Sequence, residues 1–99
     1  MNADNLKVVL EKHKMWLKGR QEGLRADFRG ADLPGANLRG ANLSGVDFTG
    51  ANLSGADLAW ANLSGVDLTG AKLNGADLTG ANLSGVDLTG IKVNEETKF

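Results

Sequence analysis

The sequence predicts an all-β solenoid with four sides and about 3.5 coils, closed at its N-terminal end by an α-helical cap. From Ala26 onward the chain repeats every five residues, and near-identical ten-residue strings begin twenty residues apart, at Ala41, Ala61 and Ala81. Before the repeats, apolar residues recur at helical spacing. We therefore divide the chain into a capping helix with its connection (1–25), a β-helix (26–95) and a C-terminal tail (96–99).

The capping helix is predicted over residues 5–18, NLKVVLEKHKMWLK. Asp4 or Asn5 is expected at its start and Gly19 just after its end. Its apolar face contains the predicted cap residues and the single histidine: Leu6, Val9, Leu10, His13, Trp16 and Leu17. We interpret the helix as a lid over the first coil, with Trp16 near Phe28. The competing interpretation is a basic amphipathic helix that binds a membrane or a calmodulin-like partner.

Each five-residue unit predicts one short extended segment followed by a corner. Thirteen units run from ADFRG at residue 26 to VDLTG ending at residue 90, and a degenerate IKVNE follows. A small apolar residue and a Leu or Phe lie two positions apart, so both point inward, and the polar residue between them points outward. The next two residues, most often Ser or Thr followed by Gly, are typical of a turn.

The twenty-residue echo indicates four units per coil, so that residues i and i+20 lie directly above one another. Val46, Val66 and Val86 then form one column above Ala26. The central Leu, Phe and Val side chains form four more columns and are the predicted core: Phe28, Leu33, Leu38, Leu43, Phe48, Leu53, Leu58, Leu63, Leu68, Leu73, Leu78, Leu83, Leu88 and Val93.

These units resemble those of the pentapeptide-repeat family, A-(D/N)-L-x-x, over about 70 of the 99 residues. The resemblance implies a right-handed quadrilateral β-helix. Some members of that family associate end to end. Others protect DNA gyrase from quinolones and are thought to act as acidic rods that imitate duplex DNA, although they are about twice as long as this chain and often carry loops.

Composition argues against an enzyme. The chain has no cysteine, no tyrosine and one histidine, His13, which we expect to be a packed residue of the cap. No catalytic, cofactor-binding or metal-binding residues are predicted, and no cofactor or small-molecule substrate. The net charge is −1, with six Lys/Arg and three acids over residues 1–25 and five Lys/Arg and nine acids beyond. Direct nucleic-acid binding is therefore disfavoured, no membrane segment is predicted, and the expected location is the cytoplasm.

The outward positions include a column made entirely of aspartate, namely Asp27, Asp47, Asp67 and Asp87. Carboxylates about 4.8 Å apart repel one another by about 1 kcal/mol even in water. One interpretation is structural: Asp and Asn both bond the backbone of their own corner, so either serves. The other is functional: the column imitates the phosphates of a nucleic acid. An equivalent column, Asn42, Asn62 and Asn82, carries no charge, and Lys72 and Lys92 stack on another face as solvated charges.

Two further features indicate protein contacts. Trp60 stands at a corner where glycine is expected, with Arg39 one coil below, close enough for a cation–π contact between them. One interpretation of Trp60 is a contact residue for a partner, and the other is a chance substitution at a tolerant surface position. The last coil is incomplete, so Leu78, Leu83 and Leu88 are expected near an open end covered by Phe99 or by a second copy; we favour a homodimer through the C-terminal coil. The predicted function is a non-catalytic scaffold or protein-interaction module with an unidentified protein partner. The alternative is a DNA-mimicking modulator of gyrase.

Overall fold

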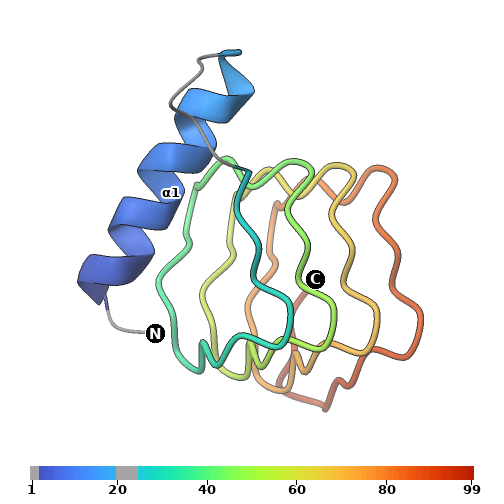
Figure 1. The fold of residues 1–99 in the computed structure, drawn as a ribbon. Helices are drawn as coiled ribbons and strands as arrows, with labels where there is room; N and C mark the ends of the chain where they lie inside the picture. The colour runs from blue at the N-terminus through green and yellow to red at the C-terminus, as the bar shows by residue number, and fades with distance from the viewer. Residues whose placement is uncertain (1–2, 20–24) are drawn as a thin grey trace.

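The computed structural model describes residues 3–19 and 25–99, which form one helix followed by a four-sided β-helix. Helix α1 (Ala3–Leu17) lies against the end of the stack formed by the first coil, and the last coil forms the opposite end (Figure 1). The parts of the predicted 1–25 segment at residues 1–2 and 20–24 lie outside the described residues.

Short parallel bridges between successive coils hold the β-helix together. Each strand is a single paired residue, and ten of the bridges join residues twenty positions apart: Asp27–Asp47, Asp32–Asn52, Asn37–Asp57, Asn42–Asn62, Asp47–Asp67, Asn52–Lys72, Asp57–Asp77, Asn62–Asn82, Asp67–Asp87 and Lys72–Lys92. On the second face, the Leu33 amide donates to the Asn52 carbonyl at 2.8 Å and the Asn52 amide donates to the Ala31 carbonyl at 2.9 Å. The predicted twenty-residue register is confirmed.

The corners follow from glycine in the left-handed region. In the first unit, the Ala31 amide donates to the Phe28 carbonyl at 3.0 Å and Gly30 has φ of 64°. A type II turn requires a positive φ at its third residue, which glycine adopts without a steric cost. The Gly30 amide then donates to the Thr49 carbonyl of the next coil at 2.8 Å, so the corner also contributes to the ladder.

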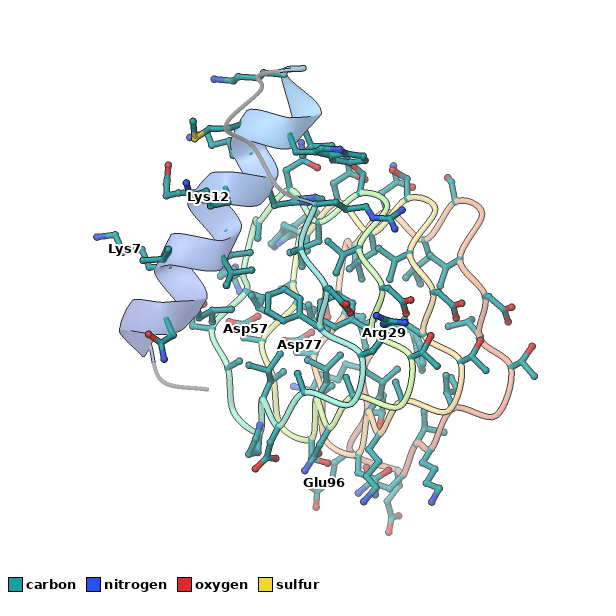
Figure 2. All side chains as sticks on the ribbon, in the orientation of Figure 1. Lys7, Lys12, Arg29, Asp57, Asp77 and Glu96 are labelled. Atoms are coloured by element: carbon teal, nitrogen blue, oxygen red, sulfur yellow. The ribbon has the colours of Figure 1, made fainter. Side chains whose placement is uncertain are left out.

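The interior is filled by the predicted columns. Every central side chain from Phe28 to Leu78 is at least 97% buried, and Phe28 stacks on Phe48 with ring centroids 5.2 Å apart. Side-chain oxygen and nitrogen atoms lie mainly on the outside of the coils (Figure 2). Burying a Leu or Phe side chain contributes about 1.5–3 kcal/mol, so this interior supplies the main driving force for folding.

The last predicted core residues are incompletely buried. For Leu83 and Leu88 this agrees with the expected open end, whereas Leu78, expected there too, is 1% exposed. Leu83 is only partly buried, Leu88 is 39% exposed and Val93 is 48% exposed. These side chains occupy the expected columns, but no coil of the structure covers them from the C-terminal side. Position in the repeat therefore fixes the direction of a side chain, whereas its burial also requires a following coil.

The ladder continues past the predicted limit at Glu95. Lys98 pairs with Asp77, twenty-one residues earlier, because the corner after Val93 contains one extra residue. The Lys98 amide donates to the Ala76 carbonyl at 2.9 Å, and the Leu78 amide donates to the Lys98 carbonyl at 2.7 Å. Residues 96–99, predicted as a tail, thus extend the third face, and Phe99 falls in register with Leu78 while remaining 60% exposed.

Helix α1 contacts the first coil through its apolar face. Leu6 belongs to the buried core cluster, and Val9 and Leu10 pack against that cluster. The helix begins at Ala3, so Asp4 and Asn5 lie within its first turn, and it ends before Gly19, whose φ of 73° matches the expected stop. Trp16 is 41% exposed, lies over Gly45 and stacks on His13.

Candidate interaction surfaces

The aspartate column forms one outer edge of the β-helix, and its carboxylates are held by their own corners. Asp47 Oδ1 accepts hydrogen bonds from the Thr49 amide at 2.9 Å and from the Thr49 hydroxyl at 2.6 Å. Asp67 and Asp87 accept the same pair of bonds from Thr69 and Thr89. A side chain that accepts from the amide two residues further on closes an Asx turn and fixes the entry into the corner.

The asparagine column uses the same geometry. Asn62 Oδ1 accepts from the Ser64 amide at 3.1 Å and from the Ser64 hydroxyl at 2.8 Å, and Asn42 bonds Ser44 in the same way. Asp and Asn thus perform the same local task with one oxygen. This equivalence supports the structural interpretation of the aspartate column.

The carboxylates of Asp67 and Asp87 are nevertheless stabilised as anions. Hydrogen bonds from the Thr69 hydroxyl and amide lower the pKa of Asp67, and they outweigh the repulsion from Asp87, which raises that pKa. The Thr89 hydroxyl and amide lower the pKa of Asp87 in the same way. Because both values move down from the ordinary range near 4, these two groups are fully ionised at neutral pH.

One cation, Arg29, pairs with the N-terminal part of the column, a contact that the sequence does not predict. The Arg29 guanidinium donates to both carboxylate oxygens of Asp27, at 3.0 and 2.8 Å, and lies 3.9 Å from Asp47. It lies on the outer surface of the first coil (Figure 2) and lowers the pKa of Asp27 to about 2. Within residues 3–19 and 25–99, Asp67 and Asp87 form no ion pair, so the acidic character is concentrated at the C-terminal half of the column.

Trp60 occupies a glycine corner in the glycine conformation. Its φ is 63°, its amide donates to the Thr79 carbonyl at 2.8 Å as a corner glycine would, and 61% of the residue is exposed. The cation–π contact with Arg39 that the register allows does not form: the indole lies over Gly80, in the following coil, while Arg39 lies 3.8 Å from Asp57. A left-handed conformation costs a residue with a side chain about 1–2 kcal/mol.

The open C-terminal end presents apolar side chains ringed by charges. Leu88, Val93 and Phe99 are exposed, and Leu83, Val86 and Ile91 are partly buried beside them. The last coil also carries two lysines and two glutamates, Lys92, Lys98, Glu95 and Glu96, all exposed. A surface with an apolar centre and charges of both signs has the composition of a protein interface.

A groove of about 630 Å³ lies between α1 and the first coil. Its apolar lining includes Leu6 and Leu10 of the helix and Leu33 and Ala36 of the coil.

In the described part of the chain, no three His, Cys, Asp or Glu side chains gather in a way that would hold a metal ion. That part also contains no helix with the length and apolarity needed to span a bilayer.

The family comparison agrees with this geometry. The model for pentapeptide repeats, described as eight copies, matches residues 25–59 and 51–90. The chain therefore belongs to the pentapeptide-repeat family, whose members form right-handed quadrilateral β-helices. Among curated protein sequences, none matches significantly.

Three solved structures of the family are similar to this chain. Rfr23 from the cyanobacterium Cyanothece 51142 is 40% identical with a TM-score of 0.52, over 78% of this chain and 56% of that one. HetL, a protein involved in heterocyst differentiation regulation in the cyanobacterium Nostoc sp. strain PCC 7120, is 39% identical with a TM-score of 0.53, over 75% and 36%. QnrB1, a plasmid-mediated fluoroquinolone resistance protein, is 32% identical with a TM-score of 0.56, over 71% and 36%. The chain thus spans between about a third and just over half of these proteins.

Proposed function

We propose that this protein is a non-catalytic interaction module that binds other protein chains. We further propose that one of these chains is a second copy of the protein, bound through the C-terminal coil. The observation that carries the proposal is the exposed apolar end formed by Leu88, Val93 and Phe99. Exposed apolar clusters bordered by polar residues mark interaction sites on soluble proteins. The family supports the coarser part of the proposal, since pentapeptide-repeat proteins are generally structural or interaction scaffolds.

A second copy suits this end because a two-fold interface must be complementary to itself. The last coil carries side chains of both signs: Lys92 and Lys98 are positive, and Asp87, Glu95 and Glu96 are negative. In a two-fold arrangement, opposite charges of the two copies can face each other around the apolar centre. The edge of the last coil also presents backbone groups that a second coil can pair with.

Light scattering after size-exclusion chromatography, at concentrations from micromolar to millimolar, tests the homodimer. We expect a mass twice the 10.4 kDa of the chain. Leu88→Asp places a charge in the proposed interface and is expected to give the monomer mass. Val8→Asp is the matched control, since Val8 is an exposed apolar residue on α1 at the opposite end and its replacement leaves the dimer intact. A monomer mass for the unmodified chain at millimolar concentration overturns the homodimer.

Trp60 is the proposed contact for a different partner protein. Large exposed aromatic residues are frequent hot spots at interfaces, and this one adopts a conformation that glycine would adopt without strain. Trp60→Gly preserves the corner, so we expect the folded state to persist while binding to partners captured by the wild-type chain weakens. Equal capture of the same partners by both chains overturns the role of Trp60.

A second candidate function, a DNA-mimicking modulator of gyrase, is favoured by one specific observation. Asp67, which is half-buried, and Asp87, which is exposed, are ionised at one edge and are unpaired with cations within the described ranges. The similarity to QnrB1 supports it further. A supercoiling assay with gyrase, with and without a quinolone, tests it. Inhibition or protection that disappears in Asp67→Asn/Asp87→Asn supports the candidate, and the absence of both effects at micromolar protein removes it.

A further inference from the structure

His13 is the one buried polar residue of the described chain, and it joins α1 to the β-helix through both ring nitrogens. Its Nε2 lies 3.0 Å from the Ser44 carbonyl oxygen, and its Nδ1 accepts a hydrogen bond from the Ala26 amide at 3.1 Å. The two partners belong to different units of the first coil. One side chain therefore connects the helix to the coil at two points.

These two bonds replace those of a preceding coil. In later units, the corner glycine amide donates to the carbonyl of the residue nineteen positions later, in the next coil, as Gly45 donates to Ser64. By the same rule, the Ser44 carbonyl would accept from the amide of residue 25; it accepts from His13 instead. Likewise, each small inward residue donates its amide to the carbonyl three positions earlier, as Ala31 does to Phe28, whereas Ala26 donates to His13.

The pair of partners fixes the protonation state of the ring. A backbone amide only donates, so Nδ1 must carry a lone pair, and a carbonyl only accepts, so Nε2 must carry the proton. A second proton on Nδ1 would point at the Ala26 N–H and remove that hydrogen bond. The imidazolium is thus incompatible with the observed contact.

We propose that α1 docks on the β-helix through the neutral form of His13 and is released when that imidazole takes up a proton. The groups around the ring favour this outcome. Arg25 is the charged residue whose field acts on His13 from the β-helix side, and it also lies 5.9 Å from the Trp16 ring that stacks on His13. On the helix itself, the sequence neighbours are two lysines, Lys12 and Lys14.

The direction of the pH dependence follows from linkage. Burial and the positive charge of Arg25 lower the pKa of His13, and they outweigh the hydrogen bond to Ser44, which raises it. In the released helix the ring regains a pKa of about 6.5. Docking is therefore at full strength above pH 6.5 and weakens as the pH falls below it, by up to about tenfold in the docking equilibrium per pH unit.

Release changes the surface of the molecule. Leu6, Val9 and Leu10 leave the core cluster, and the first coil loses the cover that these residues provide. Two exposed surfaces are created, an amphipathic helix and an uncovered apolar coil end. Mild acidity thereby converts the N-terminal end of the molecule from a closed to an open form.

Hydrogen exchange of the α1 amides, followed by NMR from pH 8 to pH 5 and corrected for intrinsic rates, tests the proposal. We expect protection of α1 to fall below pH 6.5 while the amides of the coils, such as Leu53 and Leu63, stay protected. His13→Gln supplies a donor and an acceptor that do not titrate, and its α1 protection is expected to be independent of pH. Arg25→Gln removes a cation that lowers the pKa of docked His13, so the fall in protection should be smaller in that variant and should need a lower pH.

The same fall in protection in His13→Gln, or constant protection in the wild-type chain, overturns the proposal. If His13→Gln fails to dock α1 at pH 8, the proposal is tested instead by nitrogen-15 NMR of the His13 ring in the wild-type chain. A proton on Nε2 with Nδ1 free at pH 8, together with a titration midpoint below 6.5, supports the proposal. A protonated Nδ1, or a midpoint above 6.5, overturns it.

Discussion

The Trp60 indole lies directly over Gly80, so closely that a Cβ atom at position 80 would overlap the ring. The two residues occupy the same corner of successive coils. Trp60 itself stands in the left-handed region at φ of 63°, and Gly80 at φ of 71°. Glycine is therefore required at position 80 for two reasons. The backbone there is left-handed, and the Trp60 ring leaves no space for a side chain.

A double-mutant cycle separates these two reasons. Gly50→Ala meets no atom within 4 Å, so we expect it to lower the free energy of unfolding by about 1–2 kcal/mol, the cost of the left-handed backbone alone. Gly80→Ala should cost more, because the indole must also move. In the Trp60→Gly background that excess is expected to vanish, as measured by urea unfolding. An equal loss for Gly50→Ala and Gly80→Ala in the wild-type background would contradict the contact.

Trp60→Gly alone should raise stability. The substitution removes a left-handed cost of about 1–2 kcal/mol, and the indole is too exposed to contribute much burial in return. Thermal unfolding of the variant measures the gain. A midpoint well below that of the wild-type chain would show instead that the contact with Gly80 stabilises the fold by more than the backbone strain costs.

Leu68→Ala and Leu88→Ala form a matched pair in one column. Leu68 is fully buried and Leu88 is 39% exposed at the open end. Truncating a buried leucine costs about 2–5 kcal/mol, whereas an exposed one has less burial to lose. Urea unfolding at nanomolar protein, below the concentrations at which the dimer is expected, should therefore show a large loss for the first variant and a small one for the second. Equal losses at low concentration would show that Leu88 is covered in solution.

Asp67→Asn should leave stability within about 0.5 kcal/mol of the wild-type value, since the amide oxygen keeps the bonds to Thr69, and surface changes of this kind have small effects. Asp67→Ala removes the acceptor of both bonds. We expect it to cost about 1 kcal/mol, the usual contribution of such hydrogen bonds. If Asp67→Asn proves as damaging as Asp67→Ala, the charge rather than the Asx turn holds this corner.

Arg29→Gln should raise the pKa of Asp27 from about 2 toward its usual 3.8. Carbonyl-carbon NMR of Asp27 as a function of pH measures the shift, and Arg39→Gln serves as the control because Arg39 pairs with Asp57. The folded-state pKa of Asp27 lies below that of the unfolded chain. Its contribution to stability is therefore complete above about pH 4 and is lost as the pH falls toward 2. An unchanged pKa in Arg29→Gln would contradict the ion pair.

The faces of the β-helix could be predicted because they depend only on local order. A five-residue period with a twenty-residue echo determines which residues stack, and the stacked pairs such as Phe28 and Phe48 are those that the sequence indicates. Glycine at each corner is needed for a positive φ, which a sequence shows directly. The stacking of side chains and the turns at the corners depend only on a unit and on the coil next to it.

The errors have a common physical origin, since they concern what lies beyond a residue's own unit. Leu88 and Val93 follow the pattern of the core, but their burial depends on a covering coil. The direction of the Trp60 ring and the pairing of Arg29 depend on side-chain rotamers, which a five-residue repeat does not predict. His13 was correctly expected to be packed, but its two backbone partners are set by how α1 lies on the first coil.

The extra residue after Val93 shows where this architecture tolerates insertions. The corner between Asn94 and Lys98 contains one residue more than the other corners. At this corner the Asn94 side chain, rather than a backbone carbonyl, accepts the hydrogen bond from the Gly75 amide at 3.0 Å. The next face then pairs with the coil below in the usual way. Within a strand, the same insertion would turn every later side chain to the opposite surface. Designers who wish to graft foreign loops onto this scaffold should therefore choose its corners as points of attachment.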